Sequence, residues 1–258
     1  DVWFAGYHSL FRWDGDAWTR VDVHLPGVDL DTWQDVGGSG PDDVWFVGFG
    51  EAVRWNGSSL QATYPVGRSS FFGVWAWGPD DAWIVGMEGR IGHWTGGDVY
   101  GPYWEPVDGG GSMILESVWG FAPGDIWIVG FDTTPAPDIL HWDGATVSAA
   151  GPNTLASDVW GDSTDDVWVV GAGVMHWDGT AWTDVPSPST LQLESVWGTA
   201  TADVWAVGQQ GTTAHWDGAA WSPVECPAGN QLNGVWASSS DDVWAVGRHG
   251  AILHRGPD

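Results

Sequence analysis

The sequence contains no lysine, and its basic side chains are seven arginines set against 34 aspartates and glutamates. The formal net charge is therefore −27 at pH 7. Nucleic acids and anionic membrane surfaces attract proteins through basic patches, so we expect neither as a partner. Carboxylates in such excess repel one another, and salt screens this repulsion. The composition favours a saline or extracellular setting.

Cysteine and long apolar runs are also scarce. Cys226 is the only cysteine, so it cannot form an intramolecular disulfide, and the redox compartment stays undetermined. No apolar segment has the length of a membrane span or of a signal-peptide core, so we expect no membrane insertion. Helical periodicity of useful length is missing as well. Without helical periodicity, we expect an all-β chain.

The stretch VMHWDGTAWTDV, residues 174–185, is typical of a β-hairpin. An Asp-Gly pair tolerates the positive φ angles of a tight reversal. Two registers are open, because a two-residue loop pairs Met175 with Trp182, whereas a four-residue loop pairs Trp177 with Trp182. Either register places both indoles on one face of the sheet.

This signature recurs along the whole chain. The other copies are RWDGDAW at 12–18, RWNGSSL at 54–60, HWTGGDV at 93–99, HWDGATV at 141–147, HWDGAAW at 215–221 and a worn copy, HRGPD, at 254–258. A DVWxVG-type motif precedes each of the seven, with tryptophans at Trp3, Trp45, Trp83, Trp127, Trp168, Trp205 and Trp244. Steps of 37 to 44 residues between these tryptophans match the period of propeller blades.

A third motif lies eight residues before the second, with tryptophans at Trp75, Trp119, Trp160, Trp197 and Trp236 and with Val36-Gly37 in the matching place. A complete repeat thus has four strand signals, a to d, as in ESVWG, DVWAVG, TTAHWDG and AAWSPV. Turn-forming residues separate them. The sequence predicts an all-β, seven-bladed β-propeller of four-stranded antiparallel blades.

The repeats run end to end without a linker, which predicts a single domain over 1–258. The expected repeats are about 1–33, 34–72, 73–116, 117–157, 158–194, 195–233 and 234–258. Strand a is missing from the first blade and strand d from the last. We interpret this pattern as a trimmed or incompletely covered native sequence. The alternatives are closure of the ring on unequal blades and self-association with another chain at the open strand edges.

The order VW(G/A)xxxxDDVWxVGxxGxxxHWDG resembles the blade of WD-repeat proteins, and it is more similar to tryptophan-rich propeller repeats of secreted bacterial proteins. The resemblance covers the whole chain. It implies a propeller fold, a habit of binding rather than a reaction, and a bacterial extracellular or cell-surface location. The regular Gly-His dipeptide of WD repeats is missing, so their buried hydrogen-bond tetrad is not implied.

Two features could suggest metal sites. Aspartates in the a–b turns, as in GPDDVW, are more typical of turn formers than of calcium ligands, because no D-x-D-x-D-G loop is present. A column of histidines belongs to different blades, too far apart for one zinc ion. We expect no cofactor, with calcium as the weaker alternative. The column should lie between blades with local hydrogen bonds: His93, His141, His176, His215 and His254, with Arg12 and Arg54.

Most of the 24 tryptophans fall in the four strand columns, where we expect them to fill the space between adjacent sheets. Trp33 and Trp77 fall outside these columns. Trp33 belongs to an apolar column that precedes strand a, so we expect it to be buried. Trp77 is expected in an a–b turn, where packing and exposure are equally open.

Candidate ligand-binding residues are those at which the repeats disagree. The position two before the strand a valine is irregular and should lie at the mouth of the central channel: Gln34, Phe72, Glu116, Ser157, Glu194 and Asn233. The b–c loops should open on the same face and contribute Tyr7, His8, Phe49, Glu51, Met87, Glu88, Phe131, Asp132, Gln209, Gln210, Arg248 and His249. The connections 22–31 and 107–114 complete this rim. We expect a binding funnel, with ordinary loop variation as the alternative.

Three classes of function compete. A non-catalytic recognition or scaffold module, binding a protein or a surface polymer, is favoured because no nucleophile elbow, metal-ligand cluster or phosphate loop is present. A carbohydrate-binding lectin is an alternative, although its polar ligand residues should then repeat from blade to blade. A glycoside-active enzyme would need the carboxylates of Glu116 and Glu194 about 5–9 Å apart. The expected partner is a protein or a glycan.

Overall fold

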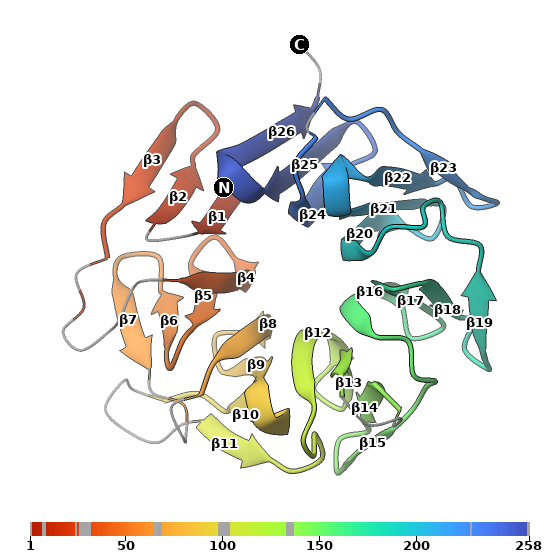
Figure 1. Cartoon of the computed structure of the whole chain (residues 1–258). Coiled ribbons are helices and arrows are strands. Elements are labelled where there is room, and N and C mark those ends of the chain that lie inside the picture. Colours follow the sequence, from red (N-terminus) through yellow and green to blue (C-terminus); the bar gives the residue numbers. More distant parts are fainter. Residues whose placement is uncertain are drawn as a thin grey trace. The chain divides into compact units, whose positions relative to one another are not determined.

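The computed structural model describes residues 2–6, 9–23, 25, 32–63, 65, 69–97, 104–132, 137–227 and 229–256. The strands of these residues form seven antiparallel sheets, the blades of an all-β propeller (Figure 1). The first and last sheets have three strands each, and the other five have four. This confirms the predicted fold class, including the missing strand a of blade one and the missing strand d of blade seven.

The blades follow one another along the chain. Blade one is β1 (Val2–Gly6), β2 (Ser9–Trp13) and β3 (Trp18–Val21); blade two is β4 (Trp33–Gly40), β5 (Asp43–Gly48), β6 (Ala52–Trp55) and β7 (Leu60–Thr63). Blade three is β8 (Phe71–Gly78), β9 (Asp81–Gly86), β10 (Ile91–Trp94) and β11 (Trp104–Val107); blade four is β12 (Ile114–Ala122), β13 (Asp125–Phe131), β14 (Ile139–Trp142) and β15 (Val147–Ala149).

The remaining blades have the same order. Blade five is β16 (Ala156–Ser163), β17 (Asp166–Gly171), β18 (Val174–Trp177) and β19 (Trp182–Val185); blade six is β20 (Leu193–Ala200), β21 (Asp203–Gly208), β22 (Thr213–Trp216) and β23 (Trp221–Pro223). Blade seven is β24 (Leu232–Ser239), β25 (Asp242–Gly247) and β26 (Ala251–Arg255). Short 3-10 turns follow strand b in blades three, six and seven: η1 (Met87–Gly89), η2 (Gln209–Gly211) and η3 (Arg248–Gly250). Among the described residues, no helix is long and apolar enough to cross a membrane.

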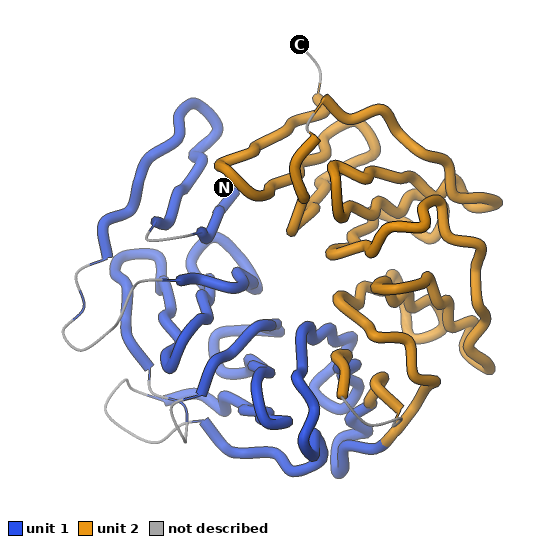
Figure 2. The backbone as a smooth tube through the Cα atoms, in the orientation of Figure 1, with its two compact units in different colours: residues 1–128, 141–148 blue, residues 129–140, 149–258 orange. Residues whose placement is uncertain are grey.

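The chain forms two compact units (Figure 2). Unit 1 comprises residues 1–128 and 141–148, and unit 2 comprises residues 129–140 and 149–258, so blade four is divided between them. Within unit 1, β4 packs against β8 and β8 against β12. Within unit 2, β16 packs against β20 and β20 against β24. In each unit, strand a of one blade therefore lies beside strand a of the next.

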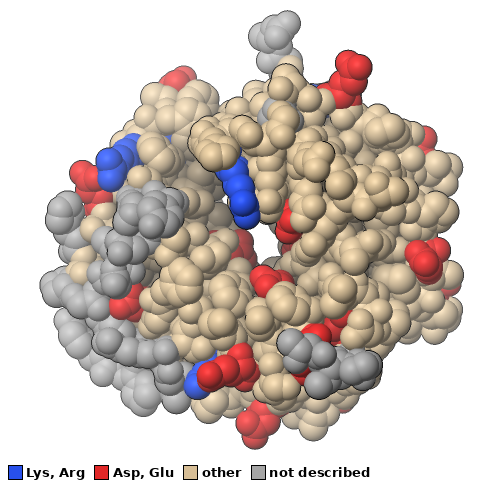
Figure 3. All heavy atoms as spheres, in the orientation of Figure 1, with Lys and Arg blue, Asp and Glu red and all other residues tan. Residues whose placement is uncertain are grey.

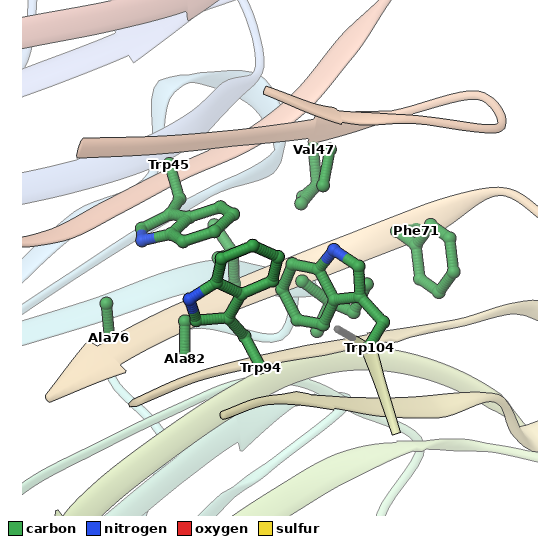
Figure 4. Close-up of a cluster of buried hydrophobic side chains, with 10 residues drawn as sticks. Trp45, Val47, Phe71, Ala76, Ala82, Trp94 and Trp104 are labelled. Atoms are coloured by element: carbon green, nitrogen blue, oxygen red, sulfur yellow. The ribbon is translucent and has the colours of Figure 1, made fainter. Parts of the chain in front are cut away.

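Tryptophans fill the space between neighbouring blades. In unit 1, the ring of Trp45 on β5 lies 5.2 Å from that of Trp94 and 5.3 Å from that of Trp104, both in the next blade (Figure 4). All three side chains are at most 2% exposed. In unit 2, Trp168 lies 4.9 Å from Trp216 of the next blade. Indoles of this size bury large apolar areas, so these contacts hold adjacent sheets together, as the sequence predicted.

The VWG motif has a packing reason. A Cβ atom on Gly198 would lie 2.4 Å from Cη2 of Trp160, the strand a tryptophan of the preceding blade. A Cβ on Gly120 would lie 3.3 Å from the ring of Trp75 and closer still to Ile126. Glycine after the tryptophan therefore leaves room for the indole of the neighbouring blade at these two positions, whereas Ala237 takes this place in blade seven.

Each histidine of the column has a local partner. The Nε2 atom of His176 lies 2.6 Å from Oδ1 of Asp166, the residue that opens strand b, and its ring stacks on Trp168 at 4.2 Å. The same pair recurs as His93–Asp81, His141–Asp125, His215–Asp203 and His254–Asp242. In blade two, Arg54 replaces histidine and donates from Nε to Asp43 at 2.7 Å. The predicted local hydrogen bonds are confirmed for the five histidines and Arg54, whereas the guanidinium of Arg12 lies over the ring of Trp3 at 5.6 Å.

The hairpin of blade five adopts the four-residue loop. Trp177 pairs directly with Trp182, and their ring centroids are 5.7 Å apart. The carboxylate of Asp178 accepts hydrogen bonds from the backbone N–H groups of Thr180 and Ala181, both at 2.9 Å. Aspartate bonded in this way fixes the turn, which selects this register over the two-residue alternative.

Two tryptophans outside the strand columns differ in burial. Trp33 is 8% exposed, as its apolar column predicted, whereas Trp77 is 52% exposed. The expected place of Trp77 in a turn is wrong, because β8 continues to Gly78. Strand a is longer than the motif suggests at its other end too, so the expected repeat boundaries fall one to three residues inside it.

Candidate functional site

In both units, the turn between strands b and c meets the segment that leads into strand a. We name this end of the blades the rim. Backbone N–H groups of the turns donate to carbonyl oxygens just before strand a: Met87 to Ser70 (2.9 Å), Gln209 to Gln192 (3.0 Å) and Arg248 to Gln231 (2.9 Å). The b–c turns and the starts of the inner strands thus lie together, in the arrangement that alternating strands predict.

Strand a carries a β-bulge at the rim. In blade six, Leu193 pairs with Gly208 and Ser195 with Val207, so Glu194 has no residue opposite it. The same shift occurs in blades two, three, five and seven. The bulged residues are Gln34, Phe72, Ser157, Glu194 and Asn233, five of the six members of the irregular column. A bulge re-aims a side chain away from the regular pleat, which is how these residues reach the rim.

The last glycine of the DVWxVG motif makes this bulge possible in blades two, three, five, six and seven. A Cβ atom on Gly208 would lie 2.2 Å from the carbonyl oxygen of Gln192. The corresponding distances at Gly48, Gly86, Gly171 and Gly247 are 2.1 to 2.3 Å. No side chain fits so close to a backbone oxygen, so the regular strand b ends in glycine where the irregular rim begins.

Three turns of the rim place a residue other than glycine in the left-handed region. The φ angles are 59° at Glu88, 56° at Gln210 and 60° at His249. All three side chains are exposed. This conformation is uncommon outside glycine and tends to occur at functional sites. The structure therefore gives three of the sequence-predicted residues the same backbone form.

A polar cluster occupies the rim of unit 2. The carboxylate of Glu194 accepts a hydrogen bond from Nε2 of Gln231 at 3.2 Å and another from the Gln209 side chain. Burial raises the pKa of Glu194, while the Gln209 hydrogen bond and the charge of Arg248 oppose this rise. The amide of Gln192 donates to the Ser157 hydroxyl at 3.0 Å. We name these residues the amide cluster: Ser157, Gln192, Glu194, Gln209 and Gln231.

The rim of unit 1 has a different character. Phe49 and Met87 are 49% and 40% exposed, and Phe72 is half-buried. Glu51, expected on the open funnel, is instead 6% exposed. The exposed surface here is thus more apolar than the amide cluster of unit 2.

A pocket of about 500 Å³ opens on this rim beside η1. Its polar wall includes Glu88 and Arg90, whose Nη2 donates to Oε2 of Glu88 at 3.1 Å. Trp104 and Pro106 line the apolar wall, and the backbone of residues 109–111 closes one side. Pro65, from the connection between blades two and three, also lines the pocket, together with part of the long 107–114 connection that the sequence singled out.

The other predicted residues are less closely grouped. Tyr7 and His8 lie outside the described residues. Phe131 and Asp132 are half-buried at the end of β13. Glu116 belongs to unit 1 and Glu194 to unit 2, so the carboxylate pair considered for glycoside chemistry is divided between the units.

Sequence reasoning missed Gln192 and Gln231, which lie one residue before strand a. A signal was available, because their column is as irregular as the one that was chosen: Thr32, Ser70, Ile114, Leu155, Gln192 and Gln231. Among the described residues, no group of three or more His, Cys, Asp or Glu is placed to hold a metal ion. On the face shown in Figure 3, acidic side chains are scattered and basic ones are few.

No family model matches the sequence, and no curated protein matches it. Among solved structures, YCF48 bound to a D1 peptide is similar, with a TM-score of 0.74 and 18% identity over 99% of this chain and 88% of that chain. YCF48 from Cyanidioschyzon merolae has a TM-score of 0.72 and 19% identity over 99% and 91% of the two chains.

A third similar structure is the extracellular domain of a proposed one-component system from B. thetaiotaomicron. Its TM-score is 0.75, with 13% identity over 99% of this chain and 40% of that chain. The TM-scores show that the fold is shared, and identities this low show nothing beyond the fold. The chain is thus similar to other β-propellers in fold alone.

Proposed function

We propose that this chain is a non-catalytic recognition module that binds a protein segment on its rim. The observation that carries the proposal is the amide cluster, in which bulged strands and turns of three blades bring together Ser157, Glu194 and three glutamines. Carboxamides offer a donor and an acceptor each, as the peptide group does. Such a surface suits the main chain of an extended segment.

The scaffold supports this interpretation. Function is often found on loops that a rigid framework positions, and the interblade tryptophans supply such a framework. The five Asp–His pairs lie where strand b begins, at the opposite end of the blades from the rim, and each histidine ring lies against the strand b tryptophan. These titratable groups therefore have a packing role, which leaves the rim for recognition.

Two of the similar structures agree with the proposal. One YCF48 structure contains a bound D1 peptide, so this fold accommodates peptides in at least one protein. Another is an extracellular domain, which fits a location at the cell surface or outside the cell. The charge of −27 favours the same location, since a saline medium screens the repulsion.

The test is capture of protein partners from native extract, run beside a glycan array, with wild type and three variants. Glu194→Gln and Gln231→Ala change the amide cluster, whereas Asp241→Asn makes the matched change of a carboxylate to an amide on an exposed a–b turn. We expect a captured partner to bind wild type and Asp241→Asn equally and to bind the two rim variants at least fivefold more weakly.

A protein partner that binds wild type and all three variants equally would contradict the proposal. Glycan binding that is lost in the rim variants, without a protein partner, would favour the lectin alternative. Equal circular-dichroism spectra and Tm values for the four proteins provide the control for folding.

A further inference from the structure

Leu155 in unit 2 has an unusual backbone and an unusual exposure for a leucine. Its φ angle is 50°, in the left-handed region that leucine rarely adopts, and its side chain is 49% exposed. Neither local sequence preference nor burial of apolar surface explains this arrangement. The residue is therefore held in place by its surroundings.

The carboxylate of Asp138 holds it. Asp138 is fully buried and accepts hydrogen bonds from Thr154 N (2.8 and 2.9 Å), Thr154 Oγ1 (3.1 Å) and Leu155 N (2.6 Å). On the other side, the carbonyl of Leu155 accepts a hydrogen bond from Ala172 N at 3.4 Å. Both peptide groups of Leu155 are thus fixed, one by a side chain from the preceding blade and one by its own blade.

This anchor carries an energetic cost. Burial raises the pKa of Asp138, so its ionised carboxylate disfavours the folded state at neutral pH relative to an exposed aspartate. A strained backbone and a buried charge together point to a feature kept for something other than stability, because strain of this kind is typical of binding and catalytic sites.

The position of Leu155 identifies the surface to which it belongs. It immediately precedes β16 (Figure 1) and stands two residues before Ser157, a member of the amide cluster. The equivalent residues of the next two blades are Gln192 and Gln231, both also members of that cluster. Leu155 is therefore the apolar residue in a row whose other members in unit 2 are carboxamides.

We propose that Leu155 is the apolar anchor of the rim, that Asp138 is its positioning residue, and that the partner contributes an aliphatic side chain within an extended basic protein segment. The inference rests on the proposed function and names the chemistry of the partner. The side chain of Leu155 has only apolar atoms, so it suits contact with an aliphatic side chain of the partner. The neighbouring carboxamides suit hydrogen bonds to the partner's main chain. A basic segment complements a chain with a net charge of −27 and no lysine.

Fixing the leucine before binding explains why the strain is retained. A contact residue that is already held in its bound conformation loses less conformational freedom when the partner arrives. The four hydrogen bonds to Asp138 supply this preorganisation without themselves reaching the surface.

The experiment uses a random twelve-residue peptide library displayed on phage and selected against the intact chain. Peptides that are enriched are synthesised, and their affinities are measured by calorimetry. We expect them to share Leu, Ile, Val or Met next to Lys or Arg. Leu155→Asn removes the apolar group but suits the left-handed conformation, so it should weaken binding at least tenfold without lowering Tm.

Two further variants separate contact from position. Leu155→Met keeps an apolar side chain and should bind within about threefold of wild type. Asp138→Asn cannot accept the same hydrogen bonds with both oxygens, so it should weaken binding at least fivefold although it does not touch the peptide. Leu155→Asn combined with Asp138→Asn should bind no more weakly than Leu155→Asn alone, because both act through one residue.

A lower Tm and an unchanged affinity in Leu155→Asn would overturn the inference, since they describe a packing residue. Enrichment of acidic or aromatic peptides would overturn the stated chemistry of the partner. Peptides that depend on Glu194 but not on Leu155 would overturn the inference and leave the proposed function standing. If no enriched peptide depends on Leu155 or on Glu194, both the inference and the proposed function are contradicted.

Discussion

The two ends of each blade differ in how strictly they repeat. Where strand b begins, five blades carry the same Asp–His pair with the histidine ring against the strand b tryptophan, and blade two carries Asp43 with Arg54. At the rim, the bulged position of strand a holds glutamine, phenylalanine, serine, glutamate and asparagine in the five blades that have the bulge. Every blade must present matching faces to its neighbours, so residues that serve packing repeat. Residues released from packing are the ones that vary.

The backbone differs between the two ends as well. The c–d turns use glycine and a capping side chain, and Asn56 in blade two caps its turn as Asp178 does in blade five. Strand a has a register shift at both of its ends, but the rim also places residues other than glycine, such as Gln210 and His249, in the left-handed region. Regular turn chemistry thus marks the structural end, and left-handed backbone at residues other than glycine marks the end proposed for recognition.

The largest effect should come from the repeated tryptophans. Trp168 is 1% exposed and packs against Trp216 and His176. Trp168→Ala should lower the free energy of unfolding by about 3–5 kcal/mol, because it removes a large buried side chain and leaves a cavity. Trp77, 52% exposed, provides the control, since Trp77→Ala should change it by less than about 0.5 kcal/mol. Urea unfolding measures both, and similar losses would break the comparison.

A smaller effect is expected from Gly208, the last residue of strand b in blade six. Gly208→Ala places a methyl group where the carbonyl of Gln192 lies, so the bulge at Glu194 must shift. We expect a loss of about 1–3 kcal/mol in the free energy of unfolding, the range for overpacking. Gly173→Ala is the matched control, because nothing lies within 4 Å of the added atom. Equal stability of the two variants in urea would show that the bulge does not need glycine.

The smallest effect should come from the exposed turn of blade five. The side-chain hydrogen bond from Thr180 and the backbone N–H groups of Ala181 and Thr180 lower the pKa of Asp178 to about 2. A lowered pKa in the folded state stabilises the fold above the ordinary value of 3.8, and this contribution is lost as the pH falls towards 2. Asp178→Ala should therefore lower Tm by at most a few °C at pH 6.

The difference between wild type and Asp178→Ala should become smaller as the pH falls towards 2. Asp178→Asn is the control, because Asn56 makes the same turn in blade two without a charge, and the difference in Tm between Asp178→Asn and Asp178→Ala should not depend on pH. Differential scanning calorimetry at both pH values measures these shifts. A difference in Tm between wild type and Asp178→Ala that is independent of pH would show that the carboxylate charge has no part in the turn.

Much of the fold follows from the sequence because packing between identical blades enforces repetition. The period predicted seven blades, the missing motifs predicted three strands in the first and last, and the apolar column predicted the burial of Trp33. The local partners of the histidines followed from the distance between sheets. Each of these predictions rests on a residue pattern that recurs in several blades.

The rim was less predictable, since its geometry depends on contacts between segments distant in sequence. The bulge at Glu194 arises where the carbonyl of Gln192 meets Gly208, a contact that no motif records. The conformation of Leu155 depends on Asp138, 17 residues earlier in the chain. Trp77 was placed in a turn because the motif for strand a ends before the strand does. Irregular positions identified the candidate surface but not how its residues are held.

Hydrogen exchange on a complex with a captured partner or an enriched peptide tests the central claim most directly. Binding should slow amide hydrogen exchange at the rim, in segments 153–157, 192–194, 209–211, 231–233 and 248–250. Exchange at the opposite end of the blades, in segments 162–165, 200–202 and 239–241, should not change. Protection of that opposite end, with the rim unaffected, would contradict the claim that the irregular end of the blades is the binding surface.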